Sequence, residues 1–120
     1  MVKPHILLVE DEEAVREIST QMLRMLGYEV TSAVDGTQAL HVIRQDPHVY
    51  DLFMLDLNLP GMSGRQLLQE LRKLRPDARA IFCSGDPEPD STPGDPPHLF
   101  KPYRLVELKT CIESQLSPAK

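Results

Sequence analysis

The sequence predicts an α/β fold in which a five-stranded parallel sheet is doubly wound, that is, covered by helices on both faces. Short apolar runs alternate with amphipathic stretches of helical periodicity, and the connections between them are short. Because crossovers between parallel strands are right-handed, such alternation places helices on both faces of the sheet. With 120 residues, 41% of them hydrophobic, the chain has the size and composition of one globular domain, here taken as 1–120.

Nine elements are expected along the chain. Five strands are expected, over 5–9, 28–33, 52–55, 80–83 and 98–100. Four helices are expected between and after them, over 12–26, 37–44, 63–74 and 104–116. In the first helix Val15, Ile18 and Met22 recur at helical spacing, and Gly27 is well placed to end it. Thr37 follows a turn and is expected to cap the second helix.

The run Leu52–Leu55 is the most strongly apolar of the predicted strands. Four consecutive apolar residues suit a strand that is buried on both faces, and the Pro60-Gly61 turn follows soon after it. Ser63 is a candidate N-cap for the next helix, which Pro76 ends. Asp56 is therefore expected at the carboxyl end of a buried strand.

The connection over 85–97 departs from the alternation of strands and helices. It contains five prolines, and a proline inside a helix costs roughly 3 kcal/mol. We therefore expect an irregular proline-rich loop where the alternation calls for a helix. The last four residues, 117–120, are expected to form a frayed tail.

Charge and composition exclude several classes of function. The net charge of −5 and the pI near 5.3 disfavour direct binding of nucleic acid, which requires a basic surface. The sequence shows neither a membrane-spanning run nor a secretory leader, so we expect a cytoplasmic protein without membrane contact. Cys83 and Cys111 lack metal-site spacing and are expected to be buried free thiols.

Polar residues follow the predicted strands at their carboxyl ends. These residues are Glu10, Asp11, Asp56, Ser84 and Lys101. Because ligands bind at this edge of an open α/β sheet, we expect the five to surround one site. Three converging carboxylates favour a hard divalent cation, and Mg²⁺ fits best because it keeps positions for phosphate oxygens. A carboxylate nucleophile, Mg²⁺, a lysine and a hydroxyl suit phosphoryl transfer to Asp56.

The ordered set of these residues resembles the receiver domain of response regulators in two-component signalling. The resemblance covers nearly the whole chain and rests on Glu10-Asp11, on Asp56 in Leu-Asp-Leu-Asn-Leu-Pro-Gly-Met-Ser-Gly, on Ser84-Gly85 and on Lys101-Pro102. It implies a flavodoxin-like sheet of order 2-1-3-4-5 and, often, a cis peptide bond before the proline. The domain would catalyse its own phosphorylation and dephosphorylation and would not be a turnover enzyme.

The resemblance also implies a role for each site residue. Asp56 would accept the phosphoryl group from a histidine kinase or a histidine phosphotransfer protein. Asp11 and Asp56 would bind Mg²⁺ directly, Glu10 mainly through water, and Asn58 through its backbone carbonyl. Ser84 would donate a hydrogen bond to the phosphoryl group and would move toward it in the switch, and Lys101 would form an ion pair with it.

Two departures from the family pattern bear on the output. His98 stands where family members usually carry the aromatic residue of the switch, and the proline-rich loop stands where they carry a fourth helix. A dimer through that face is therefore not expected, and a monomer is favoured. The shortened connection resembles receivers attached to hybrid histidine kinases.

Other functions fit the residues less well. A pseudo-receiver, which binds partners without phosphorylation, stays an alternative because of the altered switch positions, although the complete acceptor set argues against it. A phosphatase with an aspartate nucleophile would want a carboxylate where Asn58 stands. Dinucleotide binding would require a glycine-rich turn after the first strand.

Overall fold

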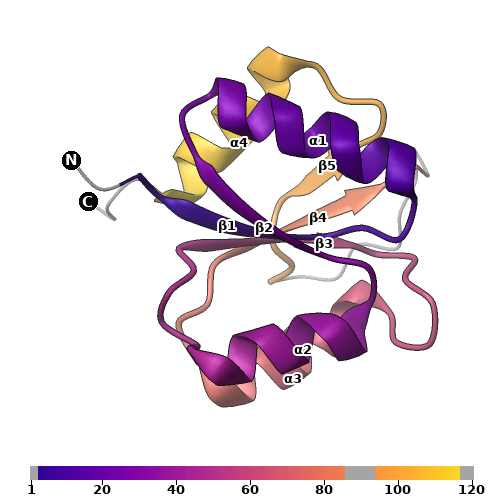
Figure 1. The fold of residues 1–120 in the computed structure, drawn as a ribbon, viewed down its shortest axis with the longest axis vertical. Coiled ribbons are helices and arrows are strands. Elements are labelled where there is room, and N and C mark those ends of the chain that lie inside the picture. The colour runs from indigo at the N-terminus through magenta and orange to yellow at the C-terminus, as the bar shows by residue number, and fades with distance from the viewer. Residues whose placement is uncertain (1–2, 86–93, 117–120) are drawn as a thin grey trace.

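The computed structural model describes residues 3–85 and 94–116, which form three layers with a sheet in the middle (Figure 1). The elements are β1 (His5–Val9), α1 (Glu13–Met25), β2 (Glu29–Ala33), α2 (Gly36–Gln45), β3 (Leu52–Asp56), α3 (Gly64–Leu74), β4 (Ala80–Ser84), β5 (His98–Phe100) and α4 (Leu105–Leu116). All paired strands run parallel, in the order β2-β1-β3-β4-β5. The predicted fold class and strand order are confirmed.

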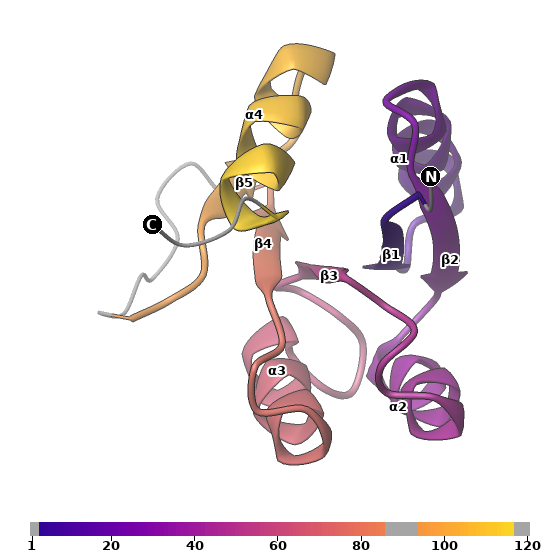
Figure 2. The same ribbon diagram turned by 90° about the vertical axis from the view of Figure 1, so that its left-hand side faces the viewer.

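Helices cover both faces of the sheet: α1 and α4 lie on one face and α2 and α3 on the other (Figures 1 and 2). Successive residues of β1 point to opposite faces of the sheet. Leu7 and Val9 pack with α2 and α3, whereas Ile6 and Leu8 pack with α1 and α4. Every residue of β3 is buried. A strand with a helix layer on each side has no solvent face, which explains the apolar run Leu52–Leu55 that precedes Asp56.

The caps agree with the sequence at two helices and differ at a third. Gly27 has a positive φ of 95° at the end of α1, and Ser63 forms a capping box with Gln66 at the start of α3. The prediction that Thr37 caps α2 is wrong. The cap is Asp35, whose extended backbone lets its carboxylate accept the N–H of Gln38 at 2.8 Å.

The connection between β4 and β5 contains no helix in its described part, Gly85 and residues 94–97. The remainder of the predicted proline-rich loop, 86–93, and the predicted frayed tail, 117–120, lie outside the described residues. Among residues 3–85 and 94–116, no helix combines the length and the apolar character needed to cross a membrane.

Candidate functional site

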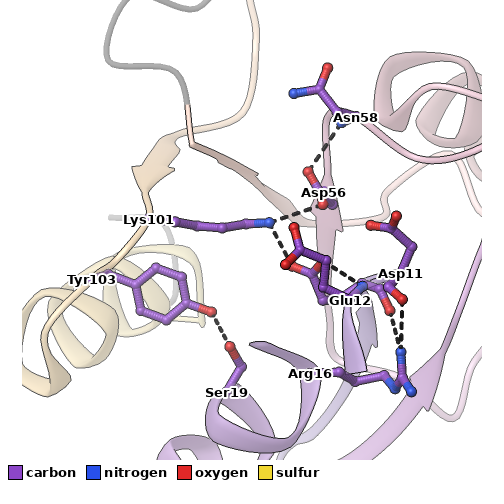
Figure 3. Close-up of polar contacts among 9 residues, drawn as sticks. Asp11, Glu12, Arg16, Ser19, Asp56, Asn58, Lys101 and Tyr103 are labelled. Carbon is purple, nitrogen blue, oxygen red and sulfur yellow. Dashed lines mark hydrogen bonds and ion pairs between the residues drawn. The ribbon is translucent and has the colours of Figure 1, made fainter. Parts of the chain in front are cut away.

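The carboxyl ends of β1, β3, β4 and β5 lie next to one another and carry the predicted site residues, among them Asp11, Asp56 and Lys101 (Figure 3). The register places Val9 beside Leu55 and Asp56 beside Cys83, so the residues that follow each strand meet at one edge. Glu10, Asp11, Asp56 and Lys101 converge there. Ser84 ends β4 at the same edge, with its side chain buried.

Three carboxylates form the acidic centre of this edge. One oxygen each from Glu10, Asp11 and Asp56 lies within 4.8 Å of the others. Glu10 and Asp56 are buried, whereas Asp11 is exposed. Close carboxylate oxygens are the donors that hard divalent cations prefer, so these residues fit a Mg²⁺ ion.

Lys101 supplies the counter-charge within the protein. Its Nζ donates to Glu10 Oε1 at 2.6 Å and to Asp56 Oδ2 at 2.9 Å (Figure 3). Burial is the largest single influence and lowers the pKa of Lys101, but the two hydrogen bonds and the negative charges of Glu10 and Asp56 together outweigh it, so the pKa is raised. Burial also raises the pKa of Glu10, although the hydrogen bond from Lys101 opposes this shift. The backbone N–H of Lys101 donates to the carbonyl of Ser84 at 2.8 Å, which anchors the lysine to the sheet. The peptide bond from Lys101 to Pro102 is cis.

The turn after β3 holds Asp56 from its other side. The N–H of Asn58 donates to Asp56 Oδ1 at 3.1 Å, and the Asn58 side chain points away from Lys101 (Figure 3). Gly64, the first residue of α3, packs directly on this turn, and its N–H donates to the carbonyl of Leu57 at 3.1 Å. A Cβ at Gly64 would lie 2.4 Å from the carbonyl oxygen of Asp56. A glycine at this position therefore lets α3 approach the backbone of Asp56.

His98 lies apart from the acidic centre. Its ring meets Phe82 edge to face at 5.5 Å, and its Nε2 is 3.4 Å from Asp95 Oδ2. Asp95 in turn forms an ion pair with Arg65 of α3 at 2.6 Å. His98 Nδ1 is buried and has no hydrogen-bond partner among the described residues. The predicted switch residue thus contacts β4 and the segment before β5.

A groove of about 540 Å³ leads to Asp56 between α1 and the segment after β5. Val15, Ile18 and Met22 of α1 line it together with Asp11, Asn58, Lys101 and Tyr103. Ile18, which the periodicity grouped with the apolar face of the helix, is 59% exposed. The hydroxyl groups of Ser19 and Tyr103 are 2.5 Å apart and join the two walls of the groove (Figure 3).

Four residues of this region were missed by the sequence reasoning: Arg16, Ser19, Gly64 and Tyr103. Gly64 carried a usable signal, because a glycine directly after an N-cap serine weakens a helix unless close packing requires it. The pairing of Ser19 with Tyr103 joins residues 84 positions apart and leaves no local pattern in the sequence.

Comparison with known families matches residues 6–95 to the response regulator receiver domain. The chain is 38% identical over 116 residues to the sensor kinase CckA of Brucella abortus, which covers 92% of this chain and 12% of CckA. It is 26% identical to sporulation initiation phosphotransferase F of Bacillus subtilis, with 97% of this chain and 96% of that protein covered. The chain spans about half or less of the length of several other curated relatives.

Two solved structures extend the comparison to three dimensions. The receiver domain of the hybrid histidine kinase CckA has a TM-score of 0.82 and 34% identity, covering 94% of this chain and 99% of that one. The response regulator TrrA of Thermotoga maritima, in complex with Mg²⁺-BeF, has a TM-score of 0.84 and 31% identity, covering 94% and 98% of the two chains.

Proposed function

The chain belongs to the response regulator receiver domain family of two-component signalling, and on this premise we propose that Asp56 is its phosphoacceptor. The observation that carries the proposal is the contact of Lys101 with Glu10 and Asp56 beside a cluster of three carboxylates. Nucleophile, counter-charge and cation ligands are thereby within reach of one another. Phosphoryl transfer requires little more than such positioning and charge neutralisation.

In the proposed reaction a carboxylate oxygen of Asp56 attacks the phosphorus of a phosphohistidine. The new O–P bond forms as the P–N bond breaks, and the released imidazole nitrogen takes up a proton. Lys101 would turn its ammonium group from the carboxylates to the phosphoryl oxygens, and the Ser84 hydroxyl would donate a hydrogen bond to them. The groove beside α1 supports this reaction, because it gives a donor side chain a path to the buried Asp56.

Glu10, Asp11 and Asp56 would hold the Mg²⁺ ion, with Asn58 contributing its backbone carbonyl and Glu10 acting mainly through water. The ion would neutralise charge on the transferred group and on the carboxylates. The Mg²⁺-BeF complex of TrrA, a relative of 31% identity, supports this assignment.

The donor would be a histidine kinase or a histidine phosphotransfer protein. The relatives named as a sensor kinase and as a phosphotransferase support this class of partner. We propose that the chain acts as a signalling switch and not as a turnover enzyme, with its output through altered partner contacts and with Ser84 and His98 as the moving residues. A monomeric state and a cytoplasmic location stay predictions.

One observation favours the alternative of a pseudo-receiver. The ring of His98 meets Phe82 edge to face and its Nε2 lies 3.4 Å from Asp95, so a movement of this residue would break existing contacts. Such a module would bind partners in one fixed conformation and would not require a phosphoryl group.

The intact mass of the protein after reaction with acetyl phosphate distinguishes the two functions. We expect a gain of one phosphoryl group that requires Mg²⁺ and is absent from Asp56→Asn. Glu107→Gln, an exposed carboxylate on α4, is the matched control and should be phosphorylated like the wild type. A gain that persists in Asp56→Asn would contradict the assignment of the acceptor. No gain from acetyl phosphate or from a phosphorylated histidine phosphotransfer protein would favour the pseudo-receiver.

A further inference from the structure

Arg16 is surrounded in sequence by acidic residues, yet its guanidinium contacts backbone carbonyl groups. It lies one turn into α1, is half-buried, and follows closely on Glu10, Asp11, Glu12 and Glu13. Its guanidinium forms no ion pair with a carboxylate among the described residues. Instead its Nη1 donates to two backbone carbonyl oxygens, that of Glu10 at 2.9 Å and that of Asp11 at 3.4 Å (Figure 3).

These two carbonyls belong to the residues that carry the acid pair. Glu10 is held to the sheet through its N–H, which donates to Ala33, and its carboxylate is held by Lys101 and by the N–H of Glu12. Asp11 is held less firmly. Within residues 3–85 and 94–116 no hydrogen bond or ion pair reaches its carboxylate, and its carbonyl is bonded by Arg16 alone.

We infer that Arg16 is a positioning residue for the cation site. It fixes the Glu10-Asp11 backbone through the 2.9 Å hydrogen bond to the carbonyl of Glu10, with a longer contact of 3.4 Å to that of Asp11, so that the Asp11 carboxylate stays near Glu10 and Asp56. The carboxylates of the same two residues lie at the edge of the sheet, where one oxygen of each is within 4.8 Å of an oxygen of Asp56. Asp11 is the exposed member of the cluster, so its side chain loses the most conformational freedom when its carboxylate binds the cation. The inference rests on the Mg²⁺ site of the proposed function.

Whether Mg²⁺ binding weakens or tightens when Arg16 is replaced distinguishes a positioning role from a purely electrostatic one. Arg16 brings a positive charge near the cation, so removing that charge alone would tighten Mg²⁺ binding. Loss of positioning acts in the opposite direction, because a disordered Asp11 binds more weakly. Residues that orient metal ligands typically change the affinity tenfold or more when they are replaced.

The test is a calorimetric titration of the whole chain with MgCl₂ at constant ionic strength and without a phosphoryl donor. We expect Arg16→Met to weaken Mg²⁺ binding about tenfold and Arg16→Lys, which keeps the charge and a donor, to fall between Arg16→Met and the wild type. Arg24→Met removes the same charge from an exposed position near the end of α1 and should bind like the wild type. Urea unfolding of each variant verifies the fold.

Equal or tighter binding by folded Arg16→Met would overturn the inference. If Arg16→Met does not fold, the test is the Mg²⁺ affinity of Arg16→Lys. An affinity equal to that of the wild type would then overturn the inference. Failure of the proposed function looks different: the wild type itself would not bind Mg²⁺, or Asp56→Asn would bind it equally well. A wild type without Mg²⁺ affinity overturns both the site and the role of Arg16.

Discussion

Lys101 lies between two buried carboxylates, and its ammonium group is the counter-charge of both. Removing one member of a buried charge group leaves the others without compensation and costs about 3 kcal/mol. We therefore expect Lys101→Met to lose about this much unfolding free energy at neutral pH without divalent cations, as measured by urea unfolding. Added Mg²⁺ should restore part of the loss, because it binds the same carboxylates.

Lys73→Met is the matched control for this prediction. Lys73 pairs with Glu70 at 2.8 Å, but both side chains are substantially exposed. An exposed pair contributes little, so the control should change stability by no more than about 0.5 kcal/mol. Equal losses in the two variants would contradict the account of Lys101 as the buried counter-charge.

The same contacts set the pH range over which Lys101 stabilises the fold. Its folded pKa is raised above the unfolded value of 10.5, so the stabilisation is complete below pH 10.5 and is lost as the pH rises through the folded pKa. The difference in unfolding free energy between wild type and Lys101→Met should therefore narrow above pH 10.5.

Among the single residues of the site, the sequence predicted which ones meet, but not that Lys101 would contact Glu10, which is 91 positions away.

Helix α3 begins against the end of β3, with no room for a side chain at Gly64. A Cβ there would meet the carbonyl oxygen of Asp56 at 2.4 Å and the Cα of Leu57 at 3.0 Å. Alanine normally favours a helix over glycine, yet we expect Gly64→Ala to lose about 2 kcal/mol because the backbone must move. Gly85→Ala, with no atom within 4 Å, should change urea unfolding by less than about 0.5 kcal/mol. A stabilised Gly64→Ala would show that the contact is not tight.

The start of α2 offers a second test. Asp35 caps the helix, whereas Thr37 lies in its first turn and is exposed. Asp35→Ala should cost about 1 kcal/mol of unfolding free energy, and Thr37→Ala should be nearly neutral, since alanine is the better helix former. The reverse order would support the cap that the sequence suggested.

The positions of the strands were predictable because burial dictates their residue types. The exact start of a helix was less predictable because it depends on a single capping hydrogen bond. Apolar runs located the strands, because a strand covered on both faces tolerates few polar residues. The wrong cap was predicted for α2 because both Asp and Thr are good N-caps, and Asp35 and Thr37 stand on either side of Gly36. The contacts of Arg16 with two carbonyls were equally hidden, since the acidic residues beside it suggest ion pairs instead.

The order of the strands brings residues that are distant in the sequence together at one site. Glu10, Asp56 and Lys101 belong to three separate strand and helix units, and the parallel sheet brings their carboxyl ends to one edge. This convergence follows from topology and was therefore predictable from the alternation of elements. The groove beside this edge was not predictable, because it depends on how α1 and the segment after β5 pack.

We have proposed that this edge of the sheet binds a phosphoryl group and a cation together at Asp56. The most direct measurement is the thermal unfolding midpoint with Mg²⁺, with beryllofluoride as a phosphoryl analogue, and with both. We expect both together to raise the midpoint of the wild type well beyond either alone, because a ligand that binds the native state stabilises it. Asp56→Asn should show no such gain. A rise of equal size in Asp56→Asn, or none in the wild type, would contradict the claim.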